Sequence, residues 1–236
     1  MFKVLAIETA TPASSVALAE GRGIVASAAR VDRTGHSAFL VPAIDFCFDQ
    51  VGWRPNDLDA VVVDVGPGLY TGIRVGIATA QGLAAAVGVP LLTAVSLDAI
   101  ALRAATGRRH IWSVVDVRRN ELAVSSYHPV PGGVVKDAPP EIVTHDELRA
   151  GLESDPKDVL LVGDTEAIGE ATLRGLHRVK KGGPRYPQAE ALIEATAASL
   201  EADEIPHPDD IRPLYLREPD VQINWAALEM DPWGER

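Results

Sequence analysis

The stretch GPGLYTGIRVGIATAQGLA, residues 66–84, decides the fold, because it leads from a buried strand into an apolar helix. It follows AVVVDVG (60–66), a continuously apolar run that is typical of a strand covered on both faces. A glycine-rich turn at such a place can bind phosphate. This motif lacks the GK[ST] ending of a Walker loop, and with it the lysine and the hydroxyl that bind phosphate and Mg²⁺. We therefore predict a structural turn, with Thr71 as the cap of a helix over about 71–87.

The segments on either side of this stretch alternate between strand and helix patterns. Short β-rich runs at turn-length spacing predict a meander at the start of the chain. Apolar residues at helical spacing predict helices before and after the quoted stretch. The predicted strands are 4–9, 14–20, 23–31 and 89–95, and the predicted helices are 37–51 and 96–105, capped by Ser37 and Ser96.

The second half of the chain repeats this plan. WSVVDVRRNELAVSSY (112–127) is a strand, a polar turn and a strand, as is VLAIETATPASSVAL (4–18), so Asp116 corresponds to Glu8. A buried strand, a glycine turn and a helix at 159–173 correspond to the quoted stretch and the strand before it. We predict two copies of one unit; chance similarity between two strand-turn-strand segments is the alternative.

The predicted organisation is an N-terminal half at 1–108 that carries the partner-binding helices, a C-terminal half at 109–219 and a tail at 220–236. Within the second half, the Gly- and Pro-rich segments 128–145 and 180–187 are interpreted as loops. A clear helical pattern covers residues 188–202.

The composition excludes several classes of protein. The net charge of −11 argues against a chain that holds nucleic acid by itself, because Lys and Arg supply most of such affinity. Pairs such as Lys180 and Lys181 are more typical of solvated loops. A single cysteine, Cys47, cannot form an internal disulfide. With no secretory leader and no long apolar run, we expect a cytoplasmic protein that does not contact a membrane.

Six ordered segments carry a family resemblance that spans nearly the whole chain. They are the first strand VLAIET (4–9), TGHS (34–37), the quoted stretch, VSLDAIA (95–101), DVRRNELAVSSY (116–127) and IRPLYLREPD (211–220). Together they resemble the TsaB (YeaZ) family. The resemblance implies an α/β fold of duplicated actin-like (ribonuclease H-like) domains, with mixed sheets flanked by helices.

The same resemblance implies a role in making threonylcarbamoyladenosine, the modified adenosine next to the anticodon of tRNA. It suggests a non-catalytic subunit that scaffolds and activates a TsaD-type transferase, with a TsaE-type ATPase as a further partner and tRNA bound only indirectly. It implies no catalytic, cofactor-binding or metal-binding residue in this chain. The alternative is an actin-fold enzyme, either a weak nucleotide hydrolase or a glycoprotease-type peptidase.

The residues agree with a non-catalytic role. In actin-like ATPases two turns cradle the phosphates, and here these turns read ETATPASS (8–15) and DVRRNELA (116–123), without any glycine. The six histidines include no pair at i, i+4, so no zinc site is predicted. There is no GxSxG motif to nominate a catalytic serine.

The helices at about 37–51 and 71–87 are apolar nearly all round, although a sheet can cover only one side of each. Small residues at Gly72, Gly76 and Ala80 allow another backbone to approach closely. The simpler interpretation is that the second half of the chain covers both helices. The more specific interpretation is an interface for a partner or for a second copy of the chain. Its predicted residues are Phe39, Ala43, Phe46, Gly72, Gly76, Ala80 and Leu83.

Overall fold

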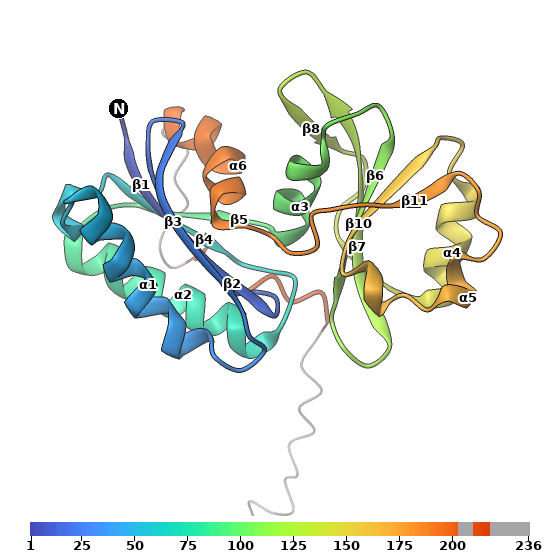
Figure 1. The fold of residues 1–236 in the computed structure, drawn as a ribbon, viewed down its shortest axis with the longest axis horizontal. Coiled ribbons are helices and arrows are strands. Elements are labelled where there is room, and N and C mark those ends of the chain that lie inside the picture. The colour runs from blue at the N-terminus through green and yellow to red at the C-terminus, as the bar shows by residue number, and fades with distance from the viewer. Residues whose placement is uncertain (203–209, 218–236) are drawn as a thin grey trace, which may run out of the picture.

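The computed structural model describes residues 1–202 and 210–217, and its first half contains a five-stranded sheet (Figure 1). The strand order is β3-β2-β1-β4-β5. β1 pairs antiparallel with β2 and parallel with β4. The first three strands therefore form the predicted meander. The strands are β1 (Lys3–Glu8), β2 (Ala13–Glu20), β3 (Gly23–Val31), β4 (Ala60–Asp64) and β5 (Leu91–Ala94).

The second sheet repeats this connectivity. Its order, β11-β10-β6-β7-β8, is that of the first sheet read from the other end, with β6 antiparallel to β7 and parallel to β10. β9 also pairs with β7 but is not part of this linear strand order. The predicted duplication and the actin-like α/β fold are thus confirmed. The strands are β6 (His110–Asp116), β7 (Glu121–Val130), β8 (Gly133–Lys136), β9 (Glu141–Thr144), β10 (Val159–Gly163) and β11 (Val179–Lys181).

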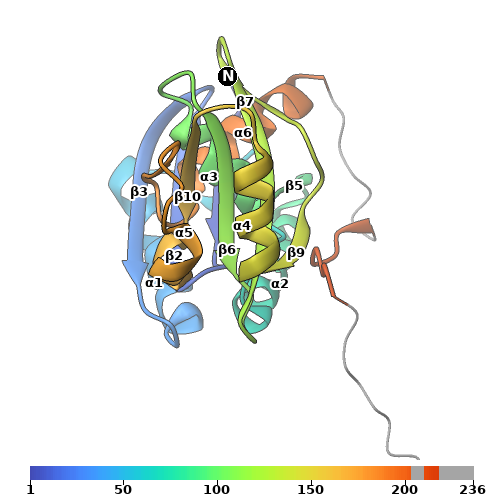
Figure 2. The ribbon, with the colours of Figure 1, turned by 90° about the vertical axis from the view of Figure 1, so that its right-hand side faces the viewer.

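The helices form layers around the two sheets (Figures 1 and 2). α1 (His36–Val51) and α2 (Tyr70–Val87) cover the outer face of the first sheet, where a large apolar core lies. α3 (Ser96–Ala104) and α6 (Ala189–Glu201) lie between the two sheets. α4 (His145–Ser154) and the short α5 (Glu170–Leu173) cover the outer face of the second sheet, as Figure 2 shows. Two 3₁₀ turns, η1 (Pro55–Asp57) and η2 (Thr165–Ala167), complete the described elements.

Each half contributes one helix that packs on the sheet of the other half. α3 packs on the second sheet, where Leu97 and Ile100 share a core with Ile111. α6 packs on the first sheet, where Leu192 shares a core with Val4. The segment 210–217 also returns to the first half, because Leu214 N donates to Val65 O over 2.8 Å. The division into 1–108 and 109–219 therefore differs from the packing, since the halves are interleaved. The predicted tail at 220–236 lies outside the described residues.

Two segments of the second half differ from their sequence patterns. The supposed loop at 128–145 contains the end of β7, all of β8 and β9, and the first residue of α4. Gly132, at φ 86°, turns the chain between Val130 and Gly133, so the Gly and Pro residues mark the turn of a hairpin. The helix expected at the end of 159–173 is reduced to η2 and α5, four residues long.

Candidate functional site

The turns after β1 and β6 meet at a small cavity between the two halves. Glu8 and Asp116 are the last residues of these strands, as the duplication predicts. The cavity has a volume of about 210 Å³. Ligand sites usually occupy about 300–1,000 Å³. Its lining is Pro12, Arg33, Leu69, Asp116, Arg118, Asp164, Glu166, Ala167 and Arg185.

Positively and negatively charged side chains line this cavity in equal numbers. Arg185 Nε donates to Asp164 Oδ1 over 3.3 Å, and its guanidinium also pairs with Glu166. Asp116 accepts a hydrogen bond of 2.8 Å from the backbone N–H of Arg118. With three arginines facing three carboxylates, the lining has little net charge to attract a phosphate. The turn of the second unit offers pairing within the chain instead of an open phosphate cradle.

The glycine-rich turn of residues 66–68 packs against the chain itself. A Cβ at Gly68 would overlap the backbone oxygen of Ala10, and Leu69 N donates to that same oxygen over 2.6 Å. Gly66 adopts a φ of 100°, which L side chains rarely reach. The glycines thus allow the turn to lie on the β1–β2 turn, which agrees with the predicted structural role.

Two buried carboxylates lie behind this turn. Glu8 Oε1 accepts from Ala10 N over 2.8 Å, whereas Oε2 is buried with no hydrogen-bond partner. Asp64 accepts from Gly66 N over 2.7 Å and from the hydroxyl of Ser96. Burial raises the pKa of Asp64 to about 7. Burial, and then the charge of Asp64, raise the pKa of Glu8 well above its ordinary value. Both side chains are closed to solvent, so neither can reach a substrate in this structure.

The row of small residues on α2 faces the core of the chain. A Cβ at Gly72 would overlap the backbone oxygen of Thr9, and one at Gly76 would overlap the hydroxyl of Thr9. Ala80 and Ala43 are also buried in the first core. The backbone that approaches closely is therefore the chain's own, at the end of β1. The interface prediction is therefore corrected at these four positions, which lie in the core of the chain itself.

The other three predicted interface residues reach the surface. Phe46 is 50% exposed on α1, while Phe39 and Leu83 are half-buried. Val41, at 56% exposed, lies on the same helix as Phe46 but was missed. Its signal was present, because Val41 falls outside the buried stripe that Leu40, Ile44 and Cys47 form on α1. We name Phe39, Phe46 and Leu83 the α1–α2 face; Val41 lies about 140° around α1 from Phe46 and is not part of it.

A cluster of aromatic rings begins α2 and was also missed. The rings of Tyr70 and Tyr215 stack with their centroids 5.5 Å apart. The Arg74 guanidinium lies 4.0 Å from the centroid of Tyr70, and its Nε donates to the Tyr215 hydroxyl over 2.8 Å. Tyr70 and Tyr215 also line a cavity of about 270 Å³ with Leu214. No sequence pattern could join Tyr215 to Arg74, because 141 residues separate them.

The hydrogen-bonded pair Ser14 and His36 is not accessible to a substrate. Ser14 Oγ lies 2.7 Å from His36 Nδ1, but both side chains are buried, and burial lowers the pKa of His36. A serine and a base that no substrate can reach cannot act as a nucleophilic pair. Within residues 1–202 and 210–217, no group of three or more His, Cys, Asp or Glu side chains is arranged to hold a metal ion.

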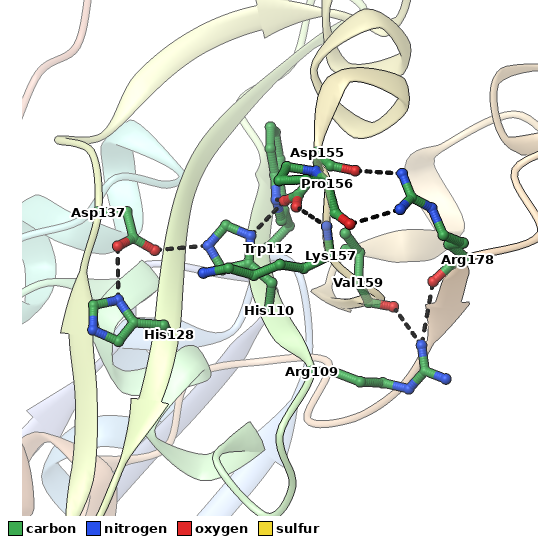
Figure 3. A network of polar contacts seen from close by, with 10 residues as sticks. All are labelled: Arg109, His110, Trp112, His128, Asp137, Asp155, Pro156, Lys157, Val159 and Arg178. Carbon is green, nitrogen blue, oxygen red and sulfur yellow. Dashed lines mark hydrogen bonds and ion pairs between the residues drawn. The ribbon is translucent and has the colours of Figure 1, made fainter.

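A second histidine cluster organises the start of the second half (Figure 3). The two ring nitrogens of His110 bond Asp155 and Asp137, and Asp137 also accepts from His128 at 2.7 Å. Asp155 accepts in addition from Trp112 Nε1 over 2.8 Å. Both ring nitrogens of His110 and both carboxylates are paired within the network, as expected of a structural cluster that ties β6 to neighbouring segments.

Comparison with known proteins supports the family resemblance. The family model described as "TsaD: tRNA N6-adenosine threonylcarbamoyltransferase" matches residues 4–225. An uncharacterized protein of Mycobacterium tuberculosis is 34% identical over 93% of each chain. The tRNA threonylcarbamoyladenosine biosynthesis protein TsaB of Bacillus subtilis is 28% identical over 96% of this chain and 99% of its own.

A solved structure agrees over nearly the same length. A protein of Pseudomonas aeruginosa, described as similar to peptidase YeaZ, superposes with a TM-score of 0.78 at 25% identity. The match covers 92% of this chain and all of the other. Among the described residues, no helix is both long and apolar enough to cross a membrane. Since the family model covers nearly the whole sequence and TsaB and YeaZ proteins match in sequence and structure, the chain belongs to the TsaD family and, within it, to the TsaB (YeaZ) group.

Proposed function

We propose that this chain is a non-catalytic subunit that scaffolds and activates a TsaD-type transferase in the formation of threonylcarbamoyladenosine on tRNA. Relatives named as biosynthesis proteins for this nucleoside support the pathway. The absence of a phosphate cradle at the small cavity supports a role other than nucleotide hydrolysis. The buried Ser14 and His36 weigh against the peptidase alternative.

The observation that carries the proposal is the exposed apolar surface of the α1–α2 face. A large aromatic side chain such as Phe46 is a typical anchor of a protein interface. The transferase is the partner that we propose for this face, and a second copy of the chain could compete for it. A TsaE-type ATPase would join the assembly, and the transferase would carry most of the contact with tRNA, because this chain has a net charge of −11.

Replacing Phe46 by Asp tests this proposal. A carboxylate at the centre of an apolar contact would be desolvated without a partner, so we expect affinity for the transferase to fall at least tenfold, by about 1.4 kcal/mol or more. Formation of the modified nucleoside, measured by mass spectrometry in a reconstituted mixture, should fall with it. Light scattering on the chain alone would report whether the same change also breaks a homodimer.

Val135→Asp is the matched control, since Val135 is 45% exposed on β8, in the other half. It should leave association and product unchanged. If Phe46→Asp binds the transferase normally, the α1–α2 face is not the interface. If product forms equally fast without this chain, the activating role is wrong.

A further inference from the structure

Positive charge is concentrated in one segment of this acidic protein. Residues 171–189 contain five Lys and Arg and no Asp or Glu, so all 33 acidic residues of the chain lie elsewhere. The segment runs from α5 through β11 to the start of α6. Among the strands that the structure describes, only β10 pairs with β11, which is therefore an edge strand (Figure 1). We name the exposed Arg and Lys side chains around this strand the β11 edge: Arg174, Arg178, Lys180 and Lys181.

Most of this charge is not neutralised by the chain itself. In the part of the chain that the structure describes, Arg174, Arg178, Lys180 and Lys181 form no ion pair with a carboxylate. Arg178 donates to the backbone oxygens of Asp155 and Pro156, both over 2.6 Å, as Figure 3 shows. Because carbonyl oxygens carry no net charge, they hold the guanidinium in place without neutralising its positive charge.

The geometry presents these charges along the strand. Lys180 and Lys181 follow one another on β11, so their side chains leave opposite faces of the sheet. Lys181 Nζ donates to Thr165 O over 3.1 Å, which holds it toward η2. Lys180, opposite Leu160 of β10, extends on the other face. The two lysines thus flank the edge of β11 from opposite faces, so a linear polyanion that lies along this edge can approach both.

We infer that the β11 edge binds the phosphate backbone of RNA, as an additional contact to the tRNA that the assembly modifies. This inference rests on the proposed function for the identity of the RNA. An acidic protein surface is the competing ligand, but protein interfaces need aromatic or large apolar anchors. None of the exposed large hydrophobic side chains in the described chain falls within 171–189. Phosphate contacts need only fixed cations and backbone donors.

The inference refines what the net charge implies. A total of −11 argues that the isolated chain binds RNA weakly, because long-range repulsion opposes the approach. At physiological salt, however, exposed charges act over only about 8 Å. Once a partner subunit holds the tRNA nearby, the local charge of the β11 edge decides whether it contributes.

The double variant Arg174→Ala/Lys180→Ala tests the inference, because both side chains are exposed and neither has a carboxylate partner among residues 1–202 and 210–217. The experiment measures tRNA binding to the assembly of this chain with its TsaD-type transferase, by fluorescence anisotropy over a range of salt concentrations. We expect the dissociation constant to rise about tenfold at physiological salt. The slope of log affinity against log salt should become shallower by about 1.5, because two phosphate contacts are lost.

Arg54→Ala/Arg103→Ala removes the same charge from exposed positions near η1 and on α3, and serves as the control. It should change the salt slope little. If the two double variants behave alike, the β11 edge is not an RNA site. If Arg174→Ala/Lys180→Ala instead weakens association between the subunits and leaves the salt slope for tRNA unchanged, the edge binds protein. Failure of the unaltered chain to join the transferase would contradict the proposed function and is seen before tRNA is added.

Discussion

At the scale of single residues, the buried carboxylate of Asp64 makes stability depend on pH. Its pKa rises from 3.8 to about 7 on folding, mainly because of burial. The protonated form therefore favours the folded state below about pH 4, and this contribution is lost as the pH rises through 7. We expect Asp64→Asn to remove this part of the loss, while Glu8, whose pKa is also raised, keeps its own part. Between pH 5 and pH 8 the variant's free energy of unfolding, measured in urea, should gain on the unaltered protein by up to about 3 kcal/mol.

The control for this prediction is Asp45→Asn, an exposed carboxylate on α1. It should follow the unaltered protein at both pH values. Asp137 and Asp155, whose pKa values are lowered, add stability mainly as the pH rises through their own low values, so they do not interfere in this window. Parallel losses of stability in Asp64→Asn and the unaltered protein would show that Asp64 ionises freely in the folded state.

At the scale of elements, α2 shows why small residues in a helix require a structural explanation. Gly72→Ala places a methyl group against the backbone oxygen of Thr9, which cannot move without shifting β1. We expect a loss of about 2 kcal/mol or more in the free energy of unfolding. In the same helix, a Cβ at Gly82 meets nothing within 4 Å, so Gly82→Ala should stabilise by about 0.5–1 kcal/mol. Thermal melts of both variants check the pair; equal effects would mean that helix propensity alone decides.

The bounds of the long helices could be predicted from the sequence more reliably than their capping residues. Apolar periodicity placed α1 and α2 within one residue of their bounds, but Thr71 and Ser37 do not cap them, since the caps are Leu69 and Gly35. The Ser96 hydroxyl donates to Asp64 and does not cap α3. A cap depends on the local backbone and on competing partners, which periodicity does not contain.

In the candidate site, too, local features could be predicted from the sequence, whereas contacts between distant segments could not. The glycine-free turns were visible in the sequence because they are local, and the structure shows the second one paired within the chain. The close approach of α2 was also deduced correctly, but its partner, Thr9, was not, because a row of small residues does not tell which backbone faces it. Tyr215, which completes the cluster at Tyr70, needed the full tertiary path of the chain.

At the scale of the whole molecule, the exchange of helices means that neither half is complete. A fragment of residues 1–108 contains the first sheet without α6, so the face of the sheet around Val4 and Val62 would be open to water. It also carries α3, most of whose buried apolar residues pack on the second sheet. Burying one large apolar side chain contributes about 1.5–3 kcal/mol, and a domain is stable by only about 5–15 kcal/mol.

We therefore expect fragment 1–108 to lack a dispersed amide spectrum by nuclear magnetic resonance, and to bind a dye specific for exposed apolar surface. Mixing it with fragment 109–236 should restore the dispersed spectrum of the full chain, because α6 would return to the first sheet and α3 would find the second. The full chain without either fragmentation is the reference for both measurements. The test separates the two ways of dividing the chain. A fragment 1–108 that folds alone would support the sequence boundary, whereas recovery only on mixing would show that α3 and α6 hold the two halves together as one cooperative unit.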